Sequence, residues 1–288
     1  MGDRQVRHGD AAAAQAAQRE VWAVGDYRRV AELLAGFGPE LVRACAVSAG
    51  QRVLDVAAGT GNVAIPAAAA GARVVACDLT PELLDQGRRA AAARGLDLDW
   101  VQADAQSLPF ADGEFDVVTS AIGAIFAPDH RATADELLRV CRPGGRIGMI
   151  NWPERGFTAD LFAVFARHAP PAPEAPSPLL WGTAQYVQDL FGDRVEALES
   201  TEQVLVVDHF ADPAALCEFY RRTFGPTIAA YAAIGADPDR VAALDRDFAE
   251  FAVRADRGRP GGPSRYEYPY VRVLATRPER AARPRVPE

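Results

Sequence analysis

The stretch Val53-Leu54-Asp55-Val56-Ala57-Ala58-Gly59-Thr60-Gly61-Asn62 decides how the rest of this 288-residue chain is organised. A short apolar run is typical of a buried strand, and the glycines that follow it allow a tight turn. Val63-Ala64-Ile65 can then open a helix. A strand, a turn and a helix N-terminus in this order form a place where a nucleoside-bearing ligand can lie against bare backbone.

Strands and helices alternate from this stretch onward. We predict strands over 52–56, 73–77, 98–102, 115–120 and 146–151, with helices over 62–70, 80–94 and 133–141. This alternation favours an α/β fold with a mostly parallel sheet and helices on both faces, in which ligands bind at the carboxyl ends of the strands. Because Asp55, Asp78, Asp104 and Ser120 all lie at such ends, we expect them to converge on one site.

Helical additions flank this core on both sides. Helix-like apolar spacing from about residue 11 to 35 and a second helix over 39–46 predict an N-terminal helical cap, residues 1–50. The core is assigned residues 51–210 and 264–280, with its last two strands over 204–210 and 268–275. Residues 211–263 are predicted to form a helical insertion before the last strand, and we expect it to cover an acceptor site.

The composition narrows the class of protein. The net charge is −8, with no lysine, and this argues against nucleic acid or an anionic membrane as a partner, since both require clustered positive charge. The four cysteines are scattered without a C-x-x-C pair, so we expect neither a zinc site nor a disulfide framework. No signal peptide and no apolar run of membrane-spanning length is apparent, and a cytoplasmic location is the expectation.

A dinucleotide-binding dehydrogenase is the first alternative to consider. Gly59-x-Gly61-x-x-Ala64 formally fits the G-x-G-x-x-G/A pattern, and Asp78 follows at the offset usual for an acidic residue that accepts from ribose hydroxyls. However, Asp55 precedes the glycines, where a carboxylate would repel a pyrophosphate. A cationic ligand that carries an amino acid would tolerate it.

Several segments resemble the motifs of class I S-adenosylmethionine-dependent methyltransferases. Residues 53–61 resemble their first motif, and Asp78 resembles the acidic residue that ends their second strand. Asp104-Ala105-Gln106-Ser107-Leu108-Pro109-Phe110 is similar to their D-A-x-x-L-P-F segment, and 115–118 and 138–145 resemble two later motifs. The order and spacing agree over 52–151, with most similarity to the small-molecule group that includes ubiquinone and menaquinone biosynthesis methyltransferases.

The resemblance implies a Rossmann-like seven-stranded sheet with an antiparallel last strand, and S-adenosylmethionine as the cofactor. Asp55 would lie near the methionine amino group, Asp78 would hold the ribose, and Asp104 with Ala105 would read the adenine. The implied cofactor-binding set is Tyr27, Asp55, Ala57, Gly59, Gly61, Asp78, Leu79, Asp104, Ala105 and Ser120, in which Tyr27 would close over the methionine carboxylate. Ala58 stands where the family commonly has Gly or Cys, and we expect this small residue to be tolerated.

Aromatic residues outside these motifs are candidates for an apolar acceptor pocket. They are Trp22, Phe126, Trp152, Trp181 and Tyr220, and ordinary core packing is the other interpretation of each. No Asn-Pro-Pro-Tyr or Asp-Pro-Pro-Tyr follows the fourth strand, where Ala121-Ile122-Gly123-Ala124 stands. This argues against methylation of an amide or base nitrogen.

His130 is the candidate general base, because it follows the fourth strand near the expected site. The alternative interpretation is an exposed residue at a helix start. His168 and His209 have two interpretations each, a residue that faces the pocket and a surface residue, and the surface interpretation is preferred for His168. No metal-binding pattern is present in the sequence.

Three functions remain open from the sequence. The first is an S-adenosylmethionine-dependent methyltransferase that acts on oxygen or carbon of a small, largely apolar, quinone-like or secondary-metabolite acceptor. The second is an enzyme with the same fold and cofactor pocket that catalyses another reaction, such as a cyclisation or decarboxylation. The third is a cofactor-binding partner protein without catalysis. A small-molecule acceptor is the expected partner, and a homodimer is a further arrangement to test.

Overall fold

The computed structural model describes residue 16 and residues 18–171 and 176–279. The chain divides into two compact units. The larger comprises 34–159, 176–205 and 268–288, and the smaller comprises 1–33, 160–175 and 206–267. Residues 18–23 are helical, whereas the beginning of the predicted helical pattern, at residues 11–15, lies outside the described residues.

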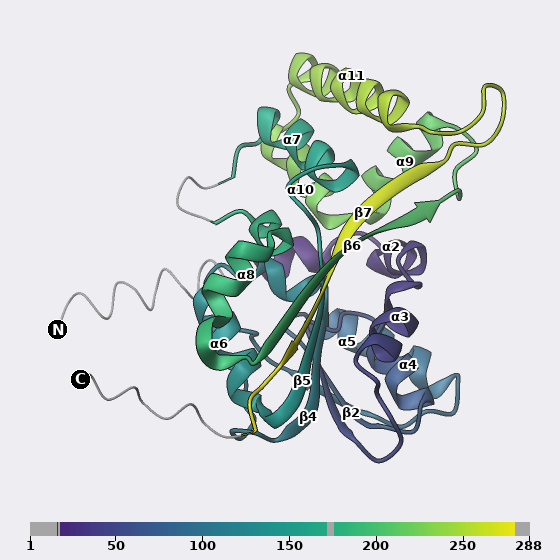
Figure 1. The fold of residues 1–288 in the computed structure, drawn as a ribbon. Coiled ribbons are helices and arrows are strands. Elements are labelled where there is room, and N and C mark those ends of the chain that lie inside the picture. Colours follow the sequence, from purple (N-terminus) through teal and green to yellow (C-terminus); the bar gives the residue numbers. More distant parts are fainter. Residues whose placement is uncertain (1–15, 17, 172–175, 280–288) are drawn as a thin grey trace, which may run out of the picture. The chain divides into compact units, whose positions relative to one another are not determined.

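The larger unit is built on a seven-stranded sheet in the order β3-β2-β1-β4-β5-β7-β6 (Figure 1). Its strands are β1 (Arg52–Val56), β2 (Arg73–Asp78), β3 (Asp99–Gln102), β4 (Phe115–Ala121), β5 (Cys141–Asn151), β6 (Ala197–Val207) and β7 (Tyr266–Thr276). The pairs from β3 to β5 are parallel, and β7 pairs with β5 in antiparallel register. The predicted seven-stranded sheet with an antiparallel last strand is confirmed.

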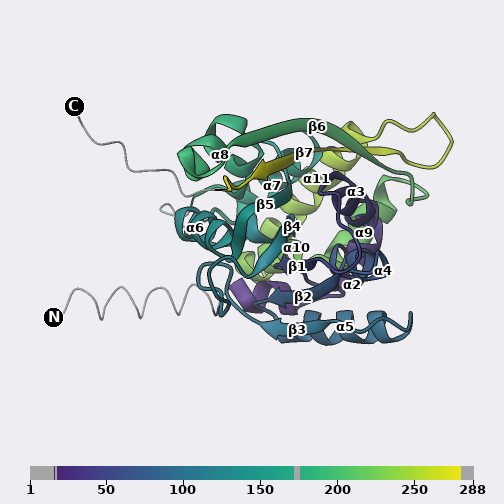
Figure 2. The ribbon, with the colours of Figure 1, turned by 60° about the horizontal axis from the view of Figure 1, so that its bottom comes forward.

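Helices cover both faces of this sheet (Figure 2). One set comprises α3 (Phe37–Ala44), α4 (Ala64–Ala69) and α5 (Pro81–Ala92), and the other comprises α6 (His130–Val140) and α8 (Ala184–Phe191). Short 3-10 turns flank the second set: η1 (Gly123–Phe126) precedes α6, η2 (Pro178–Gly182) precedes α8, and η3 (Gly192–Arg194) follows α8. The central strands are accordingly apolar on both faces: Val53, Leu54 and Val118 are completely buried.

The smaller unit contains α2 (Tyr27–Leu33), α9 (Pro213–Thr223), α10 (Gly225–Ile234) and α11 (Pro238–Ala255), together with most of α7 (Phe157–His168). Phe248 on α11 is fully buried and meets the ring of Phe165 on α7, with 5.3 Å between the centroids. Asp247, beside it, accepts from His168 at 3.0 Å when that ring nitrogen carries a proton. These contacts tie α7 to α11.

The observed elements differ from the sequence predictions in four places. The predicted helical insertion is interrupted at Phe224, which adopts extended backbone (φ −97°, ψ 111°) between α9 and α10. Strand β5 begins at Cys141 rather than at residue 146, and its pairing with β4 shifts register between Phe115 and Val117. Helix α7 was not predicted. Helix α3 belongs to the larger unit, although residues 1–50 were expected to form a single cap.

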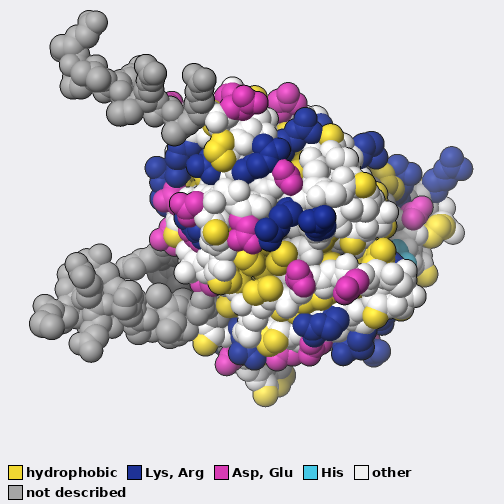
Figure 3. Space-filling model, turned by 90° about the horizontal axis from the view of Figure 1, so that it is seen from below, with side chains coloured by type: hydrophobic (Ala, Val, Ile, Leu, Met, Phe, Trp, Pro, Cys, Tyr) yellow, Lys and Arg dark blue, Asp and Glu magenta, His cyan; other side chains and the backbone are white. Residues whose placement is uncertain are grey.

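Surface charge, helix hydropathy and side-chain clusters in the described part of the chain indicate which kinds of partner and metal the protein can bind. On the face in Figure 3, basic and acidic side chains are interspersed, so this face carries no extended field of one sign. No helix in the described part of the chain is long and apolar enough to cross a membrane. All four cysteines are free and buried. Among residues 18–171 and 176–279, no group of His, Cys, Asp or Glu side chains is placed to hold a metal ion.

Candidate functional site

The loop that follows β1 is built from left-handed backbone. Ala57, Gly59 and Gly61 have φ values of 54°, 55° and 88°. Glycine adopts this conformation without steric cost, whereas an alanine does so only where surrounding contacts hold it. Two hydrogen bonds hold the loop: the Ala58 N–H donates to the Cys77 carbonyl at 2.9 Å, and the Gly61 N–H donates to the Ala58 carbonyl at 2.8 Å. The loop is therefore fastened to the neighbouring strand β2.

Asp78, the last residue of β2, is the anchor of this arrangement. Its carboxylate accepts the Gly59 N–H on one oxygen and the Thr80 N–H on the other, both at 2.8 Å. Burial raises the pKa of Asp78, while these backbone hydrogen bonds favour the charged form. The Thr80 hydroxyl and the Leu79 N–H also donate to this carboxylate, so the protein itself fixes its position and orientation.

Asp55 is buried in the core, and its carboxylate is hydrogen-bonded to protein groups. It is 1% exposed, and its carboxylate accepts the Thr119 hydroxyl at 3.0 Å and the Ala64 N–H at 2.9 Å. Desolvation raises the pKa of Asp55 to about 7, and the nearby Asp78 charge adds to the shift. Asp55 thus joins β1, β4 and the start of α4 from inside the core. Its predicted position next to a methionine amino group stays a prediction.

The carboxylate of Asp104 is held by Gln106, a residue that sequence reasoning did not assign to the site. Gln106 donates its backbone N–H to Asp104 at 2.9 Å and its side-chain amide to both carboxylate oxygens at 3.0 Å. The side-chain oxygen Oε1 of Gln106 accepts the Asp129 N–H at 2.8 Å. Gln106 therefore links the end of β3 to the start of α6. Gln106 lies within the Asp104–Phe110 motif, and this position was the feature of the sequence that could have assigned it to the site.

The loop after β4 meets the loop after β1. Ser120 is 1% exposed, and its hydroxyl accepts the Ala124 N–H at 3.1 Å. A Cβ at Gly123 would lie 2.4 Å from the Ala57 carbonyl oxygen, so only glycine permits this approach. Ile122, just before it, has φ 69°, a strained value for a β-branched residue. Ile122 and Gly123 thus fix how the two loops meet, and the sequence did not single out either one as a cofactor-binding residue.

His130 is a buried residue at the start of α6, so its interpretation as an exposed helix-start residue is wrong. It is 4% exposed and packs against Trp181, with 5.5 Å between the ring centroids. Its Nδ1 lies 2.8 Å from the Tyr186 hydroxyl of α8, and it also has a hydrogen bond with the Ile125 backbone. Desolvation lowers the pKa of His130. These contacts make His130 a link between η1, α6 and α8, and they oppose its predicted role as a general base.

The predicted acceptor-pocket residues fall into two groups. In the larger unit, Trp181 is completely buried and Trp152 is 5% exposed, so both pack in the core, and Phe126 belongs to η1. In the smaller unit, Trp22 meets the rings of Tyr27 and Phe224, and Tyr220 also meets Phe224. Trp22, Tyr27 and Tyr220 thus form one aromatic cluster.

Nine of the ten predicted cofactor residues lie at the carboxyl ends of β1 to β4 in the larger unit, and Tyr27 belongs to the smaller unit. These strand ends suit an adenosyl ligand. Asp78 and Asp104 each place a carboxylate at a strand end, and the Gly59 and Gly61 turn presents backbone without side chains. The donor and acceptor set therefore fits S-adenosylmethionine.

Comparisons with known proteins agree with this geometry. The sequence profile of a family described as methyltransferase domain matches residues 53–145. An uncharacterized protein of Mycobacterium tuberculosis is 48% identical over 241 residues, which cover 83% of this chain and 88% of that protein. A demethylmenaquinone methyltransferase of Thermus thermophilus is 45% identical over 105 residues, which cover 36% of this chain and 48% of that protein.

The YcgJ protein of Bacillus subtilis has a similar solved structure, with a TM-score of 0.56 and 21% identity over 84% of this chain and 97% of that one. This likeness concerns the fold alone. The profile match, the partial similarity to demethylmenaquinone methyltransferase and the strand-end motifs indicate the same family. The chain belongs to the class I S-adenosylmethionine-dependent methyltransferases, whose cofactor is S-adenosylmethionine.

Proposed function

We propose that this protein transfers a methyl group from S-adenosylmethionine to an oxygen or carbon atom of a small, largely apolar acceptor of the quinone-like or secondary-metabolite kind. The observation that carries the proposal is the Asp78 carboxylate, fixed at the end of β2 by the Gly59 and Thr80 N–H groups. A carboxylate preorganised in this way pays little entropy when it accepts ribose hydroxyls.

Different residues of the chain would bind different parts of the cofactor. Asp78 would accept from the ribose hydroxyls, and Asp104 with the Ala105 N–H would pair with the adenine. Gly59 and Gly61 would let the cofactor approach the backbone, with Leu79 and Ser120 beside it. When bound, S-adenosylmethionine supplies an electrophilic methyl group on a sulfonium sulfur. The protein's main contribution to such a reaction is to align the acceptor and to exclude water.

Three observations support a small apolar acceptor. The loop after β4 reads Ala121-Ile122-Gly123-Ala124, without the Pro-Pro-Tyr sequence expected for methylation of amide or base nitrogens. The net charge of −8 disfavours a polyanionic substrate. A relative with a stated reaction, the demethylmenaquinone methyltransferase of Thermus thermophilus, is named for a quinone acceptor, and its similarity covers 36% of this chain.

The proposed chemistry does not require His130 as a base. An acceptor that is already acidic, such as a phenol or an activated carbon, needs alignment more than proton removal. The buried position of His130 and its hydrogen bond to Tyr186 are consistent with a positioning role.

Two measurements test the proposal in order. Calorimetric titration with S-adenosylmethionine tests cofactor binding, and absence of binding at about 1 mM would overturn it. Mass spectrometry after incubation with quinone-like and phenolic acceptors then tests the reaction. Methyl transfer requires a product heavier by one methylene together with release of S-adenosylhomocysteine. A cofactor-dependent product of unchanged mass, or one that has lost carbon dioxide, would instead support the alternative reaction class of cyclisation or decarboxylation.

A further inference from the structure

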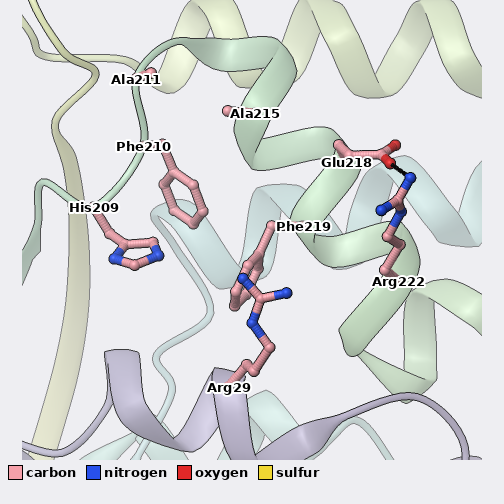
Figure 4. Close-up of a pocket in the computed structure, with 8 residues that line it drawn as sticks. All are labelled: Arg29, His209, Phe210, Ala211, Ala215, Glu218, Phe219 and Arg222. Atoms are coloured by element: carbon pink, nitrogen blue, oxygen red, sulfur yellow. Dashed lines mark ion pairs between the residues drawn. The ribbon is translucent and has the colours of Figure 1, made fainter.

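A recess with a volume of about 300 Å³ lies within the smaller unit (Figure 4). Its wall comes from three segments: Arg29 of α2, the loop at His209 and Phe210, and one face of α9. On α9 the lining residues are Ala215, Glu218, Phe219 and Arg222, spaced three and four apart, so they share one side of the helix. A recess of this size lies at the lower end of the range for small-molecule sites.

The inner surface of the recess is aromatic. Phe210 and Phe219 are 3% and 7% exposed, and their ring centroids lie 5.3 Å apart in an edge-to-face arrangement. The His209 ring meets both of them, at 5.2 and 6.0 Å. Ala215 has a small side chain, which leaves room beside these rings. The interior therefore offers aromatic faces and edges to a flat, apolar group.

The charges at the rim are unequal. Arg222 forms an ion pair with Glu218 on the same helix, so these two side chains largely neutralise each other. The Arg29 guanidinium instead lies 5.1 Å from the centroid of the Phe219 ring. Within the described part of the chain, Arg29 forms no ion pair with a carboxylate. Among the residues that line the recess, Arg29 is thus the cation that is not paired with a carboxylate.

The Arg29 guanidinium and the phenylalanine rings are placed to act on one ligand. In Figure 4 the Arg29 guanidinium projects toward the Phe219 ring, while His209 and Phe210 face the same space from the opposite side. A guanidinium can bind a carboxylate through two parallel hydrogen bonds, and a neutral or charged imidazole adds one more N–H donor. The Phe210 and Phe219 rings beside the Arg29 guanidinium can pack against an aromatic ring of the ligand while its carboxylate pairs with Arg29.

We propose that this recess is a binding site for a small aromatic carboxylate, whose anionic group pairs with Arg29 and whose ring packs against Phe210 and Phe219. The inference goes beyond methyl transfer, because the binding involves neither S-adenosylmethionine nor the strand-end residues. Glu218 does not oppose it, because Arg222 compensates that carboxylate.

Benzoate is the probe, titrated into the full chain without cofactor and followed by ligand-observed NMR. We expect a dissociation constant of about 1 mM or lower. Benzyl alcohol has the same ring without the charge, and acetate has the charge without the ring. Each should bind at least about tenfold more weakly than benzoate. Equal binding of benzoate and benzyl alcohol would overturn the role of Arg29, and equal binding of benzoate and acetate would overturn the role of the rings.

Two pairs of variants locate the binding. Arg29→Gln should weaken benzoate binding at least about tenfold, whereas Arg28→Gln, one residue earlier on α2 and outside the lining, should leave it unchanged. Ala215→Leu should fill the recess and abolish binding, whereas the exposed neighbour Ala214→Leu should not. Circular dichroism checks that each variant is folded. Absence of benzoate binding at about 10 mM, or equal affinity in Arg29→Gln and Arg28→Gln, would overturn the site.

Discussion

The backbone N–H of Gly59 donates to the Asp78 carboxylate at 2.8 Å, across nineteen positions of sequence. This hydrogen bond ties the glycine loop after β1 to the end of β2. Two parts of the expected cofactor site are thus held in place by the protein itself. The relationship also means that a change at Asp78 alters the loop as well as the contact with the ribose.

Asp78→Asn should weaken S-adenosylmethionine binding at least about tenfold. An amide has only one acceptor oxygen, so its NH₂ group would face either the Gly59 or the Thr80 N–H, and a ribose acceptor would be lost as well. Calorimetric titration measures the change. Asp97→Asn, an exposed position before β3, is the control and should bind like the wild type. An unchanged dissociation constant in Asp78→Asn would show that Asp78 does not contact the cofactor.

Asp55→Asn should change how stability depends on pH. Burial raises the pKa of Asp55 from 3.8 to about 7, so the folded protein holds a proton more tightly than the unfolded chain. The resulting stabilisation is fully present below about pH 4 and is lost as the pH rises through 7. Asparagine resembles the protonated form: it can accept the Ala64 N–H and donate to the Thr119 hydroxyl.

The measurement for Asp55 is urea unfolding of both proteins at two pH values. Between about pH 5 and pH 8, the wild type should lose roughly 2 to 3 kcal/mol of unfolding free energy relative to Asp55→Asn. Subtracting the two curves removes the contribution of groups that they share. Parallel pH profiles would mean that Asp55 titrates in its ordinary range.

Gly61→Ala should destabilise the fold more than the same substitution at another glycine with left-handed backbone. A Cβ at Gly61 would lie 2.8 Å from Cη2 of Trp100 and 3.1 Å from Cδ1 of Ile65, in addition to the backbone strain at φ 88°. Gly95 has φ 67° but nothing within 4 Å of such a Cβ, so Gly95→Ala reports the backbone strain alone. We expect Gly61→Ala to cost about 1 to 3 kcal/mol more than Gly95→Ala. Thermal unfolding of the two variants measures the difference, and equal losses would contradict the predicted clash.

Tyr186→Phe should destabilise the larger unit by about 1 to 3 kcal/mol, because it leaves a buried nitrogen of His130 without its hydrogen bond. The exposed neighbour Gln188→Ala on the same helix should stay within about 0.5 kcal/mol of the wild type. Chemical unfolding compares the two. Wild-type stability in Tyr186→Phe would mean that the Nδ1 contact contributes nothing to the link between α6 and α8.

The strand-end motifs were predictable because their information is local. An apolar run, a glycine turn and an acidic residue at a strand end lie within a few positions, so β1, β2 and β4 were expected within two residues of their observed bounds. Helix α7 was missed, and the break at Phe224 was missed because the propensities on either side continue as helix. The neighbours of Asp104 were also missed, since Gln106 reaches Asp129 only after β3 and α6 are in place.

The sequence by itself determined the type of sheet, the family and the cofactor, since the motifs that carry them are short and ordered along the chain. Only the tertiary structure decided which polar groups are buried and which are paired. Asp55 and His130 lie inside the core with protein partners, and Trp181 is packed from all sides. The recess at Arg29 and Phe219 likewise joins residues 190 positions apart. Burial and pairing depend on contacts between distant segments, and local residue patterns do not specify those contacts.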